Sequence, residues 1–248
     1  MGLELTRRDL ALLWYTWQNR LMTPRQYLRR FWSDATHQAA SKRLTHLKNE
    51  GLLQYVHFPW GADRSIYTIT AAGNRALIEA RLLPPDQTHD FPQRPLEMTA
   101  ALVQALSVVD MRIAFELSGA KGSTWIAPHQ LRQGRHLYLG NPRVADGIFS
   151  FNAHGRQGRG ILEFERQSYP RRKFIDILHS LRYAYENDTI FYVARSTERA
   201  RRVWNWAKDA WVWGDRPKNF LVTPLNLAAK DGLDALFFDL KGRGLESA

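Results

Sequence analysis

Residues 40–73 read ASKRLTHLKNEGLLQYVHFPWGADRSIYTITAAG, and this stretch decides the fold of the first part of the chain. Apolar residues recur at helical spacing as far as Leu47, and Gly51 is placed to end that helix. Two runs of strand-like sequence follow, 52–58 and 64–69, with a turn between them that contains proline and glycine. The stretch therefore predicts a helix followed by a β-hairpin.

Two shorter helices are predicted upstream of this stretch. Thr6 is placed to cap a first helix, and Thr23-Pro24 gives a second helix its cap and a proline at its first position. The helix before Gly51 is expected to start near Ser33 or Asp34 and to run to Asn49. A further helix is expected after the hairpin, which gives three helices, a hairpin and a helix in sequence order.

This order, and the residues within it, resemble a bacterial winged helix–turn–helix domain. The motifs that carry the resemblance are Ala40-x-x-x-Leu44-x-x-Leu47-x-x-x-Gly51-Leu52-Leu53 and Tyr67-x-Ile69-Thr70-x-x-Gly73. In such domains a recognition helix enters the major groove of double-stranded DNA, and the wing touches the backbone. The DNA-binding residues that the resemblance implies are Thr36, His37, Gln38, Ser41, Lys42 and Arg43 on the helix and Arg64 on the wing.

The side chains suggest a division of labour among these residues. Gln38 and Arg43 can read base edges, whereas Ser41 and Lys42 suit phosphates. An ordinary solvated helix face and a protein-binding winged helix remain open as alternatives. The aromatic residues of the first two helices are expected to be core residues or contacts of a homodimer, and these are Trp14, Trp17, Phe31 and Trp32.

The composition favours a polyanionic partner. The chain has 35 Lys and Arg against 24 Asp and Glu, which gives a formal charge of +11. The absence of cysteine excludes disulfides, thiol catalysis and cysteine-based zinc sites. No signal peptide and no apolar run of about 20 residues is recognisable, so we expect a soluble, cytoplasmic protein without a membrane partner.

Prolines divide the chain into two expected domains. A proline-rich linker is predicted over 83–95, between a winged-helix domain at 1–82 and a second domain at 96–248. The second domain is predicted to begin with a helix, to continue through a meander and then to alternate helices with strands. The helices are expected at Leu96–Leu117, at Arg171–Tyr185 and from Ser196 or Thr197, and the strands at Arg135–Leu139, Asp146–Phe151, Gly160–Glu165, Thr189–Ala194, Phe220–Thr223 and around Phe237-Phe238.

This pattern predicts an α/β sandwich with a mixed sheet, and an α+β chain overall. Asp146 and Glu163 fall on the two strands of a predicted hairpin. Glu165 is two residues after Glu163, so its side chain is expected on the same face of the sheet. Glu116 falls within the apolar stripe of the first helix. Carboxylates brought together in this way repel unless a cation neutralises them, and oxygen ligands suit Mg²⁺ or Mn²⁺.

These acids resemble the motif of the PD-(D/E)XK nuclease superfamily. The resemblance implies that Glu116 is the helical acid, Asp146 the metal-binding aspartate and Glu163 the second metal ligand. Glu165 stands where the superfamily has a lysine, and only Lys173 on the next helix is placed to substitute for it.

Both domains together resemble the replication-relaxation family of plasmid and mobile-element proteins. That family has a winged helix, a Pro-Asp strand, a Leu-Glu-x-(Asp/Glu)-Arg strand and then a helix that begins with lysine. Here the corresponding residues are Ala145-Asp146, Leu162-Glu163-Phe164-Glu165-Arg166 and Lys173.

The expected function is therefore DNA binding in replication, plasmid mobilisation or transcription control, with relaxosome or replication proteins as further partners and a nuclease-like domain that is not catalytic. A Mg²⁺-dependent endonuclease and a winged-helix interaction module are the alternatives. For the carboxylates, the alternative is that Asp146 caps a turn while Glu163 and Glu165 pair with Arg143, Arg166 or Arg171 on a solvated sheet face.

Overall fold

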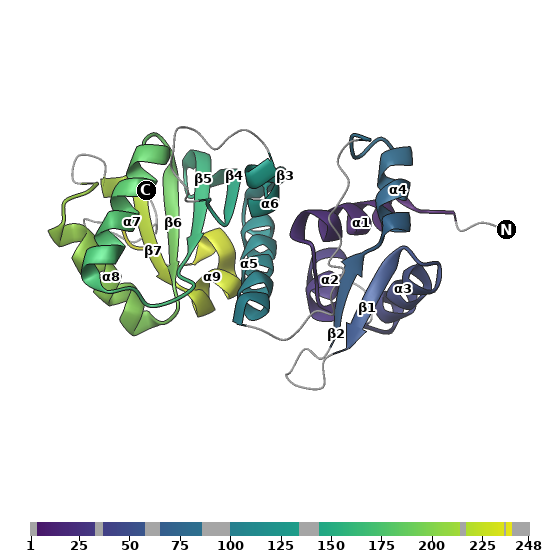
Figure 1. Cartoon of the computed structure of the whole chain (residues 1–248). Coiled ribbons are helices and arrows are strands. Elements are labelled where there is room, and N and C mark those ends of the chain that lie inside the picture. The colour runs from purple at the N-terminus through teal and green to yellow at the C-terminus, as the bar shows by residue number, and fades with distance from the viewer. Residues whose placement is uncertain are drawn as a thin grey trace. The chain divides into compact units, whose positions relative to one another are not determined.

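The computed structural model describes residues 4–32, 37–57, 65–85, 100–133, 144–213, 217–235 and 237–239. The chain is of mixed α and β structure and divides into two compact units, Met1–Val109 and Asp110–Ala248 (Figure 1). The division falls inside a helix, α5 (Ala100–Leu117). Of the linker predicted over 83–95, Leu83 is buried and residues 86–95 lie outside the described residues.

The first unit opens with three helices. They are α1 (Arg7–Asn19), α2 (Pro24–Phe31) and α3 (His37–Asn49). Thr6 and Thr23 cap α1 and α2, each through a reciprocal capping box with the third helical residue. The predicted caps are confirmed, as is the end of α3 at Asn49; its predicted start lies outside the described residues.

A hairpin and a fourth helix complete this part of the unit. They are β1 (Leu53–His57), β2 (Ser65–Ile69) and α4 (Ala71–Glu79). The two strands are antiparallel, with Tyr55 opposite Tyr67. Met22, between α1 and α2, adds an isolated bridge to Tyr67, with backbone hydrogen bonds of 3.0 and 2.8 Å in the two directions. The segment between α1 and α2 therefore adds one short bridge to the second strand of the hairpin.

The first half of α5 belongs to the first unit. Leu102 is buried in one cluster with Leu21 and Ile66, and the amide of Gln26 donates a hydrogen bond of 2.9 Å to the Leu106 carbonyl. Apolar burial and this bond together explain why the compact unit extends beyond residue 100.

The second unit is built on one five-stranded sheet. Its strands are β3 (Ala120–Ile126), β4 (Gly147–Ala153), β5 (Arg156–Phe164), β6 (Thr189–Ala194) and β7 (Phe220–Pro224), in that spatial order. β3, β4 and β5 are antiparallel neighbours, whereas β5, β6 and β7 run parallel. The predicted mixed sheet is confirmed.

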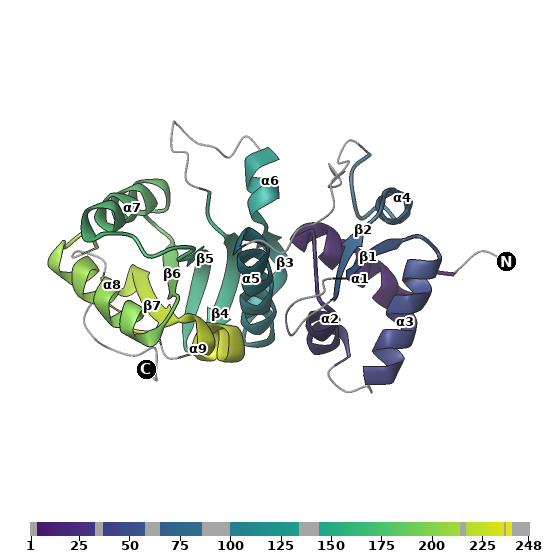
Figure 2. The same cartoon turned by 60° about the horizontal axis from the view of Figure 1, so that its bottom comes forward.

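Helices cover both faces of this sheet (Figures 1 and 2). The second half of α5 packs on one face, where the Phe115 ring lies 5.4 Å from Phe149 and 5.6 Å from Phe191, measured between ring centroids. α9 (Leu225–Asp231) lies on this side as well, whereas α7 (Arg171–Ala184) and α8 (Thr197–Asp209) cover the other side. Successive residues of a strand point to opposite faces, so Tyr192 faces α7, and its ring lies 5.5 Å from that of Phe174.

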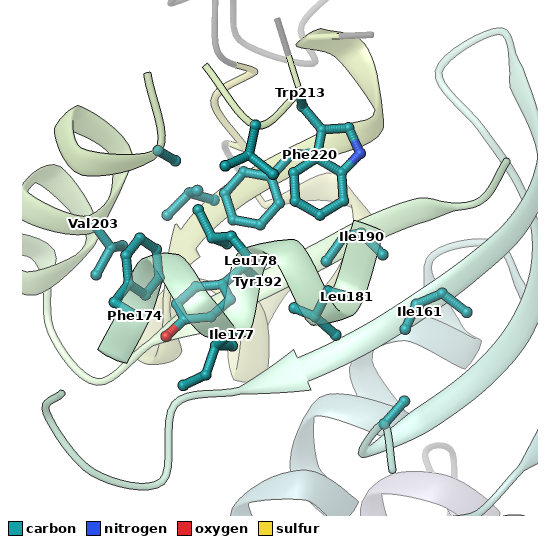
Figure 3. Packing of buried hydrophobic residues seen from close by; sticks show 14 of the residues in the cluster. Ile161, Phe174, Ile177, Leu178, Leu181, Ile190, Tyr192, Val203, Trp213 and Phe220 are labelled. Carbon is teal, nitrogen blue, oxygen red and sulfur yellow. The ribbon is translucent and has the colours of Figure 1, made fainter. Parts of the chain in front are cut away.

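A cluster of buried apolar side chains forms the core under α7 and α8 (Figure 3). Phe174 and Leu178 of α7 are buried against Ile190 and Tyr192 of β6. Phe220 of β7 stacks on Trp213 with 5.1 Å between the ring centroids. This packing fixes the position of the strand ends where the candidate acids lie.

Some elements were not predicted. β3, α6 (Pro128–Gln133) and α9 are absent from the sequence interpretation, and the strand predicted at Arg135–Leu139 lies outside the described residues. β5 begins at Arg156, four residues before its predicted start. Phe238 makes only an isolated bridge, to Val222.

Candidate functional site

The centre of the exposed face of α3 carries polar and basic side chains. Ala40, Leu44 and Leu47 form its buried face. The residues at the centre of the opposite face follow a spacing of four, three and four positions, and they are Gln38, Lys42, Thr45 and Asn49, all exposed. The helix His37–Asn49 contains no acidic residue. No carboxylate of the helix itself therefore opposes the approach of a polyanion; the nearest acidic residue along the chain on the C-terminal side is Glu50, directly after the helix.

Arg43 is turned away from this face. Its Nε donates a hydrogen bond of 2.7 Å to Asp9 on α1, and its Nη2 forms a second contact with the same carboxylate. Asp9 is buried, and Thr6 adds a 2.8 Å bond from its backbone N–H. Arg43 therefore links α3 to α1 through Asp9. In this conformation its guanidinium does not support the predicted contact with base edges.

The Asp9–Arg43 pair makes the first unit sensitive to acid. Burial acts to raise the pKa of Asp9, but hydrogen bonds from Arg43 and Thr6 outweigh burial and hold it below its ordinary value of 3.8. A lowered folded-state pKa stabilises the protein above pH 3.8, and this contribution is lost as the pH falls through the folded pKa. We expect Asp9→Asn to lower the free energy of unfolding by about 1–3 kcal/mol at pH 7.

Urea unfolding of the wild type and Asp9→Asn at pH 7 and at pH 2.5 measures this effect. The difference between the two proteins should shrink at the lower pH, because Asp9 of the unfolded wild-type chain is then protonated and the contribution of its lowered folded-state pKa is reduced. A difference that stays constant across this range would contradict the assignment.

The other predicted DNA-binding residues divide into two groups. His37, Gln38 and Lys42 are exposed, and Ser41 is half-buried with its hydroxyl 3.3 Å from the Nδ1 atom of His37. Thr36 and Arg64 lie outside the described residues. The hairpin adds a residue that the sequence did not single out: Tyr55 is exposed, and the Lys48 ammonium lies 5.8 Å from its ring centroid.

Three of the four predicted acids lie together at the end of β5. Asp146 precedes Gly147, which pairs with Leu162, so it lies beside Glu163. Glu165 follows the strand and donates its backbone N–H to the Val193 carbonyl at 2.9 Å. All three acids are buried, so the alternative of a solvated sheet face is excluded.

Asp146 is held by a backbone group and by an arginine. Its Oδ2 accepts a hydrogen bond of 2.8 Å from the Phe164 N–H, and its Oδ1 lies 2.5 Å from Nη2 of Arg166. The charge of Asp146, with a smaller contribution from Glu163, raises the pKa of Arg166 above its ordinary value. One guanidinium therefore acts on both carboxylates.

Glu165 is paired with Arg199, a residue that the sequence interpretation missed. Nε of Arg199 donates a bond of 2.7 Å to Oε1 of Glu165, and both side chains are buried. Arg199 also donates a 2.9 Å bond to the Tyr169 carbonyl and lies 4.9 Å from the Trp206 ring centroid. One signal was available: Arg199 precedes Val203 and Ala207 by four and eight positions, and both are buried.

Glu116 does not join these acids, which corrects the predicted convergence. Glu163 pairs with Tyr192 in register and therefore lies on the face covered by α7. Glu116 lies on α5, against the opposite face, with its carboxylate packed over Gly122 of β3. Its Oε1 accepts a bond of 2.7 Å from Arg112, and both side chains are buried. A buried stripe brings Glu116 to the sheet, but to the other side of it.

The remaining cations near the cluster have other contacts. The Lys173 ammonium lies 5.2 Å from the Tyr169 ring centroid, and Arg171 pairs with Asp209 at 3.3 Å. Arg143 lies outside the described residues. Among the residues that the structure describes, which include all four acids, no three His, Asp or Glu side chains are grouped to hold a metal ion.

The helices of the described ranges are all too short or too polar to cross a membrane. Comparison of the chain with family models, with curated proteins and with solved structures finds no match.

Proposed function

We propose that this chain is a DNA-binding protein of plasmid or mobile-element replication, mobilisation or transcription control. The observation that carries the proposal is the exposed face of α3, where Gln38, Lys42, Thr45 and Asn49 are presented by a helix, His37–Asn49, that contains no acidic residue. The surplus of 35 basic over 24 acidic residues in the chain supports the same partner.

We assign the first unit to the winged helix–turn–helix class. Its order of helix, short bridge, two helices, hairpin and helix resembles that class, and α3 takes the place of the recognition helix. The side chains of Gln38 and Asn49 suit base edges, whereas Lys42 suits a phosphate.

We assign the second unit to the PD-(D/E)XK-like class, as a domain without catalytic activity. Its order of helix, three-stranded meander, helix and parallel strand resembles that class. Arginines hold Asp146 and Glu165, and Glu165 stands in the place of the lysine. Catalysis would require these side chains to be free for a metal or for water.

Substitutions on α3 test the DNA-binding proposal. Lys42→Ala should weaken binding to all duplexes and reduce the magnitude of the slope of log K against log salt by about 1, because one phosphate contact is lost. Gln38→Ala should cost about 1–3 kcal/mol at a preferred site. Fluorescence anisotropy over a salt series measures both effects, and Arg75→Ala on α4 is the charge-matched control.

The same assays distinguish the alternatives. A protein-interaction module would show weak DNA binding that neither Lys42→Ala nor Gln38→Ala alters. An endonuclease would cleave supercoiled plasmid in the presence of Mn²⁺, and this cleavage would disappear in Asp146→Asn. Cleavage of that kind would overturn the assignment of the second unit as non-catalytic.

A further inference from the structure

Trp211 is a large apolar side chain that is left in solvent. It is 71% exposed, whereas the other tryptophans between residues 204 and 213 have structural contacts. The indole N–H of Trp204 donates to the Asp239 carbonyl at 2.8 Å, and Trp206 and Trp213 pack on buried aromatic rings. Trp211 therefore contributes little to the stability of its unit through burial.

The backbone at Trp211 is also unfavourable for this residue. Trp211 follows the end of α8, where its N–H donates to the Lys208 carbonyl at 3.1 Å, and its φ is +55°. Glycine is the usual residue at this position of a helix end, because side chains of L-residues disfavour positive φ. The chain thus keeps a tryptophan in an unfavourable conformation without burying it, which favours a role in binding over a role in folding.

The segment that carries Trp211 runs along α7. Asp209 pairs with Arg171 at 3.3 Å, and the Val212 carbonyl accepts a hydrogen bond from Arg182. The two arginines are separated by about three turns of α7. Trp211 therefore lies between two contacts with arginines of the same helix.

The surface of α7 and α8 around this segment is aromatic and basic. The two helices lie side by side on one face of the sheet (Figure 2), and Tyr183 on α7 is 72% exposed. α7 has four basic residues and one acidic residue, and α8 has four and two. Two of these three acids are already paired with arginines of the same surface. The other exposed cations of the two helices are Arg172, Lys173, Arg201 and Lys208.

We infer that this aromatic–basic surface, formed by Trp211, Tyr183 and these cations, binds single-stranded DNA. Unpaired bases stack on exposed aromatic rings, and neighbouring cations neutralise the phosphates between them. The stacking surface stands apart from α3, and only the choice of DNA over RNA rests on the proposed function.

Trp211→Gly is the decisive variant, because glycine suits the backbone at this position. Its melting temperature, measured by calorimetry, should equal or exceed that of the wild type. Its Kd for a labelled oligothymidylate of about 15 nucleotides should rise roughly 5- to 100-fold, as expected for the loss of one stacked base. Fluorescence anisotropy with the full chain measures this Kd.

Two further variants serve as controls. Trp211→Phe keeps an aromatic ring and should bind oligothymidylate within about threefold of the wild type. Arg81 is exposed and also has a positive φ, +59°, so Arg81→Gly relaxes the backbone and removes a charge without removing a ring. It should bind as the wild type does. An oligothymidylate that contains iodouracil should photocrosslink to Trp211 or Tyr183.

Equal binding of oligothymidylate by Trp211→Gly and by the wild type would overturn the inference, as would a wild type that does not bind it. A Trp211→Gly protein that melts clearly below the wild type would show that the indole has a structural role instead. Tighter binding of oligouridylate than of oligothymidylate would overturn the choice of DNA. Duplex binding should be unchanged in Trp211→Gly, so a failure here is distinguishable from a failure of DNA binding by α3.

Discussion

Replacing Arg199 with methionine is expected to lower the free energy of unfolding of the unit Asp110–Ala248 by about 3–5 kcal/mol. The reason is the partner that remains: Glu165 is fully buried, and Arg199 donates to its Oε1 at 2.7 Å. Loss of the arginine leaves a buried carboxylate that must either keep its charge without a partner or take up a proton. Urea unfolding followed by tryptophan fluorescence measures the effect, since Trp206 lies beside Arg199.

Arg202→Met provides the matched control. Arg202 lies on the same helix and pairs with Glu198, but both side chains are more than half exposed, so its loss should cost less than about 1 kcal/mol. Adding Glu165→Met to Arg199→Met should recover much of the stability, because no isolated charge then remains. A small cost for Arg199→Met alone would show that Glu165 is not dependent on it.

Gly232→Ala is expected to destabilise the same unit by about 3–5 kcal/mol. Gly232 has a φ of +62° and ends α9, where its backbone lies against the end of α5. A Cβ at this position would overlap the Ala114 carbonyl oxygen and Ser118 Oγ. The substitution therefore combines an unfavourable backbone conformation with a clash that involves main-chain atoms.

Gly155→Ala separates these two causes. Gly155 also has a positive φ, +66°, but a Cβ there would meet nothing within 4 Å. Only the conformational cost remains, and we expect about 1–2 kcal/mol. Equal effects of the two alanines in urea unfolding would exclude the proposed clash.

Local signals explain which elements could be predicted from the sequence. Thr6 and Thr23 cap helices with their side chains and Gly51 follows the end of one, and the helix ends that these residues predict are confirmed. β6 was predicted at its observed limits, because a strand buried on both faces is a continuous apolar run. β3 has small residues such as Gly122 and no clear alternation, and its strand conformation depends on pairing with β4.

The candidate site was only partly predictable, because some of its contacts follow from local sequence patterns and others depend on tertiary structure. The hairpin register places Asp146 beside Glu163, and a two-residue period could anticipate this arrangement. Helical periodicity also placed Glu116 on a buried stripe, but a sheet has two faces and periodicity does not say which one a helix covers. The pairing of Glu165 with Arg199 spans 34 residues, so it depends on tertiary structure alone.

The position of the unit boundary within α5 has a consequence for synthesis on the ribosome. The first unit is complete once Val109 has been made, whereas the sheet of the second unit lacks an edge until β7 at Phe220–Pro224 is available. At ~5–20 residues per second, the roughly 140 later residues require ~7–28 seconds. During this interval the nascent chain contains all of α3 but only part of the sheet of the second unit, so under the proposed function the residues of the DNA-binding surface are made before the second unit is complete.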